Sequence, residues 1–155
     1  MSDERDPNKV GFDALSKQLE AKLAGRSDDL TANSEVNELI DDGYMNIIRK
    51  SSTSFVMFYR TVCPYCKQLI PILEELAGDY ETKVMFAKVN LEVVEEAQKR
   101  FDILGVPVVM AFKKGNLVGR IEGLRGINEY DTWIDSIHKG LRPMGIDSGP
   151  TTNLQ

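Results

Sequence analysis

Hydrophobic residues occur in two different patterns along this chain, and their alternation predicts an α/β fold. Continuous apolar runs of strand length, such as residues 54–60, are typical of strands that are buried on both faces of a sheet. Between these runs, apolar residues recur every three or four positions, which is the spacing of a helix with one buried face. The expected strands are residues 36–40, 54–60, 83–90, 106–112 and 117–122, and the expected helices are residues 43–50, 66–77, 92–101 and 128–139.

This order of elements predicts a mixed sheet. Strands that alternate with helices are joined by crossovers and run parallel, whereas the strands on either side of residues 113–116 form a hairpin and run antiparallel. Gly115 suits the positive φ that this hairpin turn requires. The expected architecture is a central mixed β-sheet with helices on both faces.

Single residues indicate where the helices begin and end. Gly78 is expected to end the second helix, and Pro71 inside that helix removes a backbone hydrogen bond and should kink its axis. Asn128 is expected to cap the last helix, and Gly140 to end it.

The two ends of the chain differ from its middle. Residues 1–34 are polar and contain a leucine at every fourth position between residues 15 and 23, which predicts an N-terminal extension with a short amphipathic helix. The compact domain is expected to span residues 35–140. Residues 141–155 are rich in proline and glycine and are expected to form a flexible tail.

The composition excludes several classes of function. With 155 residues, of which 42% are apolar, the chain suits one globular domain with a single core. A net charge of −5 argues against a nucleic-acid-binding protein, which needs a basic face. There is no apolar run near the roughly 20 residues that span a bilayer, and the first residues lack the apolar stretch of a secretory signal. We therefore expect a cytoplasmic protein without membrane contact. We also expect it to be a monomer.

The two cysteines lie within one four-residue window, Cys63 to Cys66. A bridge between them closes too short a loop to stabilise the fold, so reactivity is the better reason for the pair. The pair also stands where a buried strand turns into a helix. Cys63 then lies at the helix N-terminus, where unpaired amides stabilise a thiolate, and Pro64 fits the first turn. We assign Cys63 as the nucleophile and the more deeply buried Cys66 as the resolving thiol.

Metal binding is the main alternative use of such a pair. A zinc site normally needs two further ligands, yet the chain has no third cysteine and its one histidine, His138, is far along the sequence. We therefore expect no bound metal or cofactor, and a redox-active Cys63–Cys66 disulfide instead. An iron–sulfur cluster or metal shared by two chains through Cys63 stays open as a non-enzymatic role.

Several motifs at matching separations resemble the thioredoxin family over about two-thirds of the chain, from residue 35 to residue 138. The 41-residue step from Cys66 to Pro107 also suits a thioredoxin. The resemblance implies a thioredoxin fold that carries an N-terminal helical extension. The matching segments are Cys63-Pro64-Tyr65-Cys66-Lys67, Pro71-Ile72-Leu73-Glu74-Glu75-Leu76-Ala77, Ala87-Lys88-Val89-Asn90, Gly105-Val106-Pro107-Val108, Phe112-Lys113-Lys114-Gly115, and Gly123.

The resemblance also implies how substrates are held. Pro107 would be a cis-proline that faces the cysteines and turns the Val106 backbone towards a substrate segment for strand-like pairing. Gly123 matches the glycine that closes the substrate groove. The implied substrate-binding residues are Val62, Pro64, Tyr65, Val106 and Gly123.

The chain departs from the usual thioredoxin pattern in three ways. Pro-Tyr between the cysteines is the glutaredoxin version, so we expect a weaker reductant than a typical thioredoxin. Met57 stands where the family has a buried aspartate that helps to deprotonate the resolving cysteine. Lys88 is retained and is a candidate for tuning Cys66 electrostatically; proton transfer through water is the other route. Tyr59 and Val62 replace the flanking tryptophans.

The resemblance implies a thioredoxin-like oxidoreductase that reduces disulfides in cytosolic proteins. Its partners would be those proteins and a thioredoxin reductase that uses FAD and NADPH. Two related activities stay open. One is a glutaredoxin-like reaction with glutathione or another small thiol, and the other is a disulfide oxidase or isomerase activity, since the exchange runs in either direction.

Overall fold

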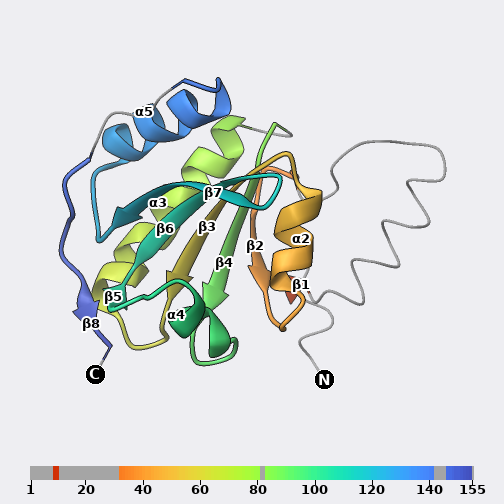
Figure 1. Ribbon diagram of the computed structural model, residues 1–155. Helices are drawn as coiled ribbons and strands as arrows, with labels where there is room; N and C mark the ends of the chain where they lie inside the picture. The colour runs from red at the N-terminus through yellow and green to blue at the C-terminus, as the bar shows by residue number, and fades with distance from the viewer. Residues whose placement is uncertain (1–8, 11–31, 81–82, 142–145, 155) are drawn as a thin grey trace.

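The computed structural model of the protein describes residues 9–10, 32–80, 83–141 and 146–154. In these residues a six-stranded sheet has the order β1-β2-β4-β3-β6-β7 (Figure 1). The strands β1, β2, β4 and β3 run parallel to one another, whereas β6 is antiparallel to both β3 and β7. The mixed α/β architecture is therefore confirmed. The strands are β1 (Lys9–Val10), β2 (Val36–Leu39), β3 (Thr53–Tyr59), β4 (Met85–Asn90), β6 (Val108–Lys113) and β7 (Asn116–Glu122).

Helices cover both faces of this sheet (Figure 1). Side chains alternate between the faces of a strand, so Phe55 and Phe58 of β3 point in opposite directions. Phe55 packs edge-on against Trp133 of one helix, and Phe58 packs against Phe101 at the end of another. The helices are α2 (Tyr44–Lys50), α3 (Pro64–Tyr80), α4 (Glu96–Arg100) and α5 (Ile127–His138).

The core is centred on β3, which explains its uninterrupted apolar sequence. Residues 53–58 of this strand are all buried, because the helices on the two faces leave neither side in contact with water. The aromatic ring of Phe55 lies 5.6 Å from those of both Phe86 and Trp133. The rigid centre of the sheet therefore ends directly before the segment that carries the cysteines.

Helix α3 is longer than predicted, because it passes through Gly78 and ends at Tyr80. The expected stop at Gly78 is wrong. The Tyr80 ring is largely buried, and its hydroxyl donates hydrogen bonds of 3.0 and 3.2 Å to the side chain and backbone carbonyl of Asp131 in α5. These contacts hold the last turn of α3 against α5 and outweigh the low helix propensity of glycine.

The boundaries of the next two helices also differ from prediction. Helix α5 begins at Ile127 with Gly126 as its N-cap, so Asn128 does not cap it. The Glu129 carboxylate accepts the Gly126 N–H at 3.2 Å and satisfies an amide at this end of the helix. Helix α4 covers only five residues, because residues 91–95 before it form turns.

The glycines that the sequence predicted at turns agree with the structure better than the predicted helix boundaries do. Lys114 and Gly115 at the tip of the β6–β7 hairpin both have positive φ, at 51° and 87°. Gly140, which follows Lys139 at the end of α5, has a φ of 75°. The prediction that Gly115 supplies a positive φ in the hairpin turn is confirmed.

The two ends of the chain add strands that the sequence did not predict. Strand β1 pairs with β2 at one edge of the sheet. The amphipathic helix expected around residues 15–23 lies outside the described residues. Residues 146–154, which we call the C-terminal segment, return along the domain, and their strand β8 (Thr152–Asn153) pairs antiparallel with β5 (Gly105–Val106). This pairing differs from the expected flexible tail, because it joins the end of the chain to the domain through backbone groups.

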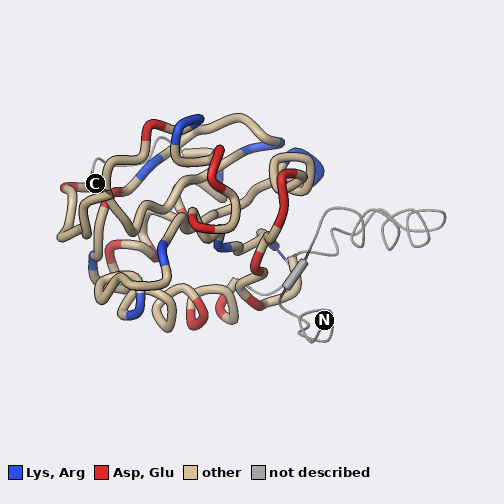
Figure 2. The backbone as a smooth tube through the Cα atoms, turned by 90° about the horizontal axis from the view of Figure 1, so that it is seen from below, with Lys and Arg blue, Asp and Glu red and all other residues tan. Residues whose placement is uncertain are grey.

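The charged residues are mixed over the described backbone, where Figure 2 shows Lys and Arg positions interspersed with Asp and Glu positions. Ion pairs between described residues include Arg60–Glu92 and Arg120–Glu122, and the pairs Arg100–Glu96, Arg125–Glu129 and Lys139–Asp135 link residues four apart on one helix or turn. Within the described parts of the chain, none of the helices has both the length and the apolar character needed to cross a membrane.

Candidate active site

Cys63 and Cys66 form a disulfide at the start of α3. The buried strand β3 ends at Tyr59, and the chain turns through a short connection before the helix begins at Pro64. Proline fits this first helical position, because it has no N–H that would lack a partner there. The local sequence therefore places both sulfurs at the N-terminal end of a long helix, as predicted.

Backbone amides of the first helical turn point at Cys63. The Cys66 N–H donates a hydrogen bond to Cys63 Sγ at 3.2 Å, and the Lys67 N–H donates to the Cys63 carbonyl at 3.1 Å. When the disulfide is reduced, the same Cys66 amide and the positive end of the helix dipole favour the ionised form of Cys63. This geometry supplies what a nucleophilic thiolate needs.

The two cysteines are equally buried, each with 1% of its surface exposed. The expectation that Cys66 would be the more buried of the two therefore fails in this oxidised state. Cys63 Sγ is bonded to Cys66 Sγ, and the Val106 carbonyl oxygen lies 3.7 Å from Cys63 Sγ. Little of either sulfur is therefore accessible to a reaction partner in this state.

Segments far apart in the sequence meet at the disulfide. The Val106–Pro107 peptide bond is cis, as the resemblance implies. The Val106 carbonyl faces Cys63 Sγ, and the Pro107 carbonyl accepts the Gly123 N–H at 2.8 Å. Gly123 has a φ of 93°, a conformation that side-chain-bearing residues rarely adopt. The structure thus brings Cys63, Val106, Pro107 and Gly123 together in one site.

The other residues expected to contact substrates lie on the rim of this site. Val62 has 80% of its surface exposed, and Pro64 is also exposed. Tyr65 is half-buried and packs against the core. Val62 is therefore an exposed apolar side chain next to Cys63 in the chain.

Lys88 belongs to a polar cluster on β2, β3 and β4. It lies opposite Met57, which is fully buried, and its ammonium group is 5.8 Å above the Tyr59 ring. The Tyr59 hydroxyl donates a hydrogen bond to the Glu38 carboxylate. Burial and this carboxylate raise the pKa of Tyr59 above its ordinary value, so the hydroxyl stays protonated. The structure therefore groups Lys88 with Tyr59 and Glu38, and Met57 offers no ionisable group.

Sequence reasoning missed the C-terminal segment as a neighbour of this site. The Gly149 N–H donates to the Glu122 carbonyl at 2.8 Å, and the Leu124 N–H donates to the Pro150 carbonyl at 3.1 Å. These bonds run along both sides of Gly123. The only sequence signal was Gly149-Pro150, which is also typical of a flexible loop.

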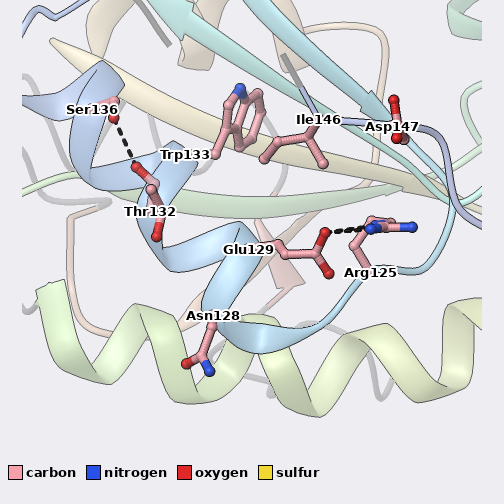
Figure 3. Close-up of a pocket in the computed structure, with 8 residues that line it drawn as sticks. All are labelled: Arg125, Asn128, Glu129, Thr132, Trp133, Ser136, Ile146 and Asp147. Atoms are coloured by element: carbon pink, nitrogen blue, oxygen red, sulfur yellow. Dashed lines mark hydrogen bonds and ion pairs between the residues drawn. The ribbon is translucent and has the colours of Figure 1, made fainter. Parts of the chain in front are cut away.

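A cavity of about 390 Å³ lies between α5 and the C-terminal segment (Figure 3). Trp133 and Ile146 contribute apolar side chains to its lining. Arg125 and Glu129, which form an ion pair with each other, also line it. Its lining does not include the cysteines. In the described residues there is no group of three or more His, Cys, Asp or Glu side chains placed to hold a metal ion.

Comparison with known proteins identifies the family. The thioredoxin family model matches residues 35–136. A thioredoxin of Staphylococcus saprophyticus is 33% identical over 76 residues, which cover 49% of this chain and 73% of that protein. The reduced thioredoxin pre-protein of Schistosoma mansoni superposes with a TM-score of 0.60 at 28% identity, covering 66% of this chain and 97% of that one. A thioredoxin from Trypanosoma brucei brucei shares the fold with a TM-score of 0.62 at 20% identity, over 68% of this chain and 93% of that one.

The matched residues contain the Cys63–Cys66 pair, the cis-proline and the helix that carries the sulfurs. The fold, the family match and the disulfide at the helix N-terminus agree with one another. The chain therefore belongs to the thioredoxin family and is an oxidoreductase of thiol–disulfide exchange.

Proposed function

We propose that this protein reduces disulfide bonds in cytosolic proteins, with Cys63 as the nucleophile and Cys66 as the resolving thiol. The observation that carries the proposal is the 3.2 Å hydrogen bond from the Cys66 amide to Cys63 Sγ. It supports Cys63 as the sulfur whose negative charge the helix would stabilise. The proposal assigns this chemistry to the domain of residues 35–140.

The exchange proceeds in two displacement steps. The Cys63 thiolate attacks one sulfur of the substrate disulfide, forms a mixed disulfide and releases the other substrate sulfur as a thiolate. Cys66 then loses its proton and attacks Cys63 Sγ, which expels the second substrate thiolate and forms the Cys63–Cys66 disulfide. The substrate gains the two electrons that the Cys63–Cys66 dithiol loses. Cys66 supplies one of the two protons that the substrate thiols take up, and the other comes from water, which received it when Cys63 ionised. The structure is that of the final, oxidised state.

Substrate recognition is proposed at the residues around the sulfurs. The Val106 backbone would pair with an extended substrate segment, and Pro107 would hold this backbone beside Cys63. Gly123 would leave room for the segment, while Val62, Pro64 and Tyr65 would contact it on the rim. For Lys88 we propose an electrostatic influence on Cys66; its position opposite the buried Met57 supports that role.

We also propose that a thioredoxin reductase containing FAD and using NADPH regenerates the dithiol. The test compares the rate at which the oxidised protein is reduced by such an enzyme with NADPH and by glutathione at millimolar concentration. We expect the reductase to be much the faster electron donor. The opposite order would favour the glutaredoxin-like alternative, for which the Cys-Pro-Tyr-Cys sequence is the supporting observation.

The two residues between the cysteines lead to a prediction about the reduction potential. Glutaredoxins, which share Pro-Tyr at these positions, have potentials of about −200 to −230 mV, compared with about −270 mV for thioredoxin. We expect a value in the glutaredoxin range, and a shift towards the thioredoxin value in the double variant Pro64→Gly/Tyr65→Pro. Equilibration with glutathione or dithiothreitol buffers measures both. A wild-type potential near about −270 mV would contradict the prediction.

A further inference from the structure

The end of the chain lies on the backbone edge that the proposed function assigns to substrates. Strand β8 pairs antiparallel with β5, so that Thr152 lies opposite Val106 and Asn153 lies opposite Gly105. The Leu154 N–H donates to the Leu104 carbonyl at 3.1 Å. Figure 1 shows β8 alongside β5, next to the end of α3 that carries the cysteines. An extended peptide of this chain therefore occupies the edge beside Cys63.

Along two antiparallel strands, residue pairs that are hydrogen-bonded alternate with pairs that are not, and this alternation identifies which backbone groups of β5 and β8 form hydrogen bonds. Leu104 and Leu154 form a hydrogen-bonded pair, so the next pair along, Gly105 with Asn153, is of the non-hydrogen-bonded kind. The pair after that, Val106 with Thr152, is again of the hydrogen-bonded kind. The backbone of Thr152 is thus paired with that of Val106, whose carbonyl oxygen lies 3.7 Å from Cys63 Sγ.

Contacts further back along the C-terminal segment fix its path. Gly123 and Gly149 cross so closely that a Cβ on Gly123 would collide with the Gly149 backbone, and a Cβ on Gly149 would collide with the Leu124 carbonyl. At Gly105, an added Cβ would lie 2.9 Å from Thr151 Oγ1. Ile146, at the start of the segment, packs against the core, and Figure 3 shows it beside Trp133. The segment is therefore held at several points.

We propose that the C-terminal segment is a built-in competitor of protein substrates: it pairs with Val106 and must leave this edge before a substrate segment pairs there. The inference rests on the proposed function, because it assumes that substrates use the Val106 backbone. The apparent affinity for a protein disulfide is then lowered by the fraction of molecules in which the edge is free. A small disulfide needs no backbone pairing and reacts without this restriction.

The test uses full-length variants that release the segment. Thr152→Pro removes the N–H that faces Val106, and Gly149→Val introduces a Cβ that collides with the Leu124 carbonyl. Asn153→Pro is the matched control, because the Asn153 N–H belongs to a non-hydrogen-bonded pair and points away from β5. Reduction of insulin, with dithiothreitol as the electron source, is compared with the reaction of each reduced protein with the small disulfide DTNB.

We expect Thr152→Pro and Gly149→Val to lower the KM for insulin by roughly three- to tenfold, the range that corresponds to the net contribution of about one hydrogen bond. The two release variants should keep the kcat of the wild type and its rate with DTNB. The control Asn153→Pro should keep both the KM and the kcat of the wild type for insulin. An unchanged or higher insulin KM in both release variants, with normal DTNB rates, would overturn the inference. If the proposed function itself were wrong, the wild type would not reduce insulin, and this outcome is distinct from an unchanged KM in the release variants.

Discussion

Replacing Cys63 with serine is expected to lower the rate of insulin reduction to that of the uncatalysed reaction. A serine hydroxyl is not ionised at neutral pH and cannot form a disulfide, so neither the first displacement nor the closing disulfide is possible. The loss should be at least about 1,000-fold in kcat/KM, comparable with losses on removing a catalytic nucleophile in other enzymes. Insulin turbidity with dithiothreitol as electron donor, corrected for the reaction without protein, measures it.

Cys66→Ser is the matched variant, because it removes the other sulfur from the same turn of helix. It should keep the first displacement and lose the second, so that mixed disulfides through Cys63 accumulate. Mass spectrometry after reaction with a protein disulfide would detect them, and a thiol such as dithiothreitol would release them. Full dithiol activity of Cys66→Ser without trapped partners would show that the roles of the two cysteines are wrongly assigned.

Phe55→Ala is expected to cause the largest loss of stability, about 3–5 kcal/mol in the free energy of unfolding. Phe55 is fully buried in the central strand, and its ring packs on Phe86 and Trp133. Its removal loses both the transfer free energy of the ring and the packing of two aromatic neighbours from different elements. Urea unfolding of the oxidised protein, followed by tryptophan fluorescence, gives the change from the shift in midpoint at constant m.

Leu117→Ala provides the comparison for Phe55→Ala. Leu117 lies in the edge strand β7 with 47% of its surface exposed, so its truncation should change stability by less than about 0.5 kcal/mol. A loss below about 1.5 kcal/mol for Phe55→Ala would contradict the central place of this ring in the core.

The parts of the fold that bury side chains were predictable from the sequence. The run Phe55-Val56-Met57-Phe58 has no polar residue, and the structure places it in a strand covered on both faces. The site was predictable for a similar reason, since Cys63 and Cys66 stand together where a buried strand turns into a helix, a place that favours thiolate chemistry. That Val106 lies close to Cys63 followed only from the family resemblance, because the two are far apart along the chain.

The parts that failed depend on contacts that a local pattern does not record. Gly78 looks like a helix stop, but the Tyr80 hydroxyl reaches Asp131 on another helix and keeps the last turn in place. Asn128 looks like the N-cap of α5, but the helix begins one residue earlier, and the Glu129 carboxylate accepts a hydrogen bond from the Gly126 N–H. The pairing of β8 with β5 uses backbone groups, which every residue has, so side-chain periodicity could not reveal it.

The crossing of Gly123 and Gly149 offers a way to sort related chains from their sequences alone. The close approach leaves no space for a β-carbon on either residue, so both positions must be glycine for the two backbones to cross in this manner. Gly123 matches the glycine that the family resemblance implies at the substrate groove, and the informative position is therefore Gly149 with the proline that follows it. Relatives with a larger residue there, or with a shorter chain, should have an open edge at the redox centre.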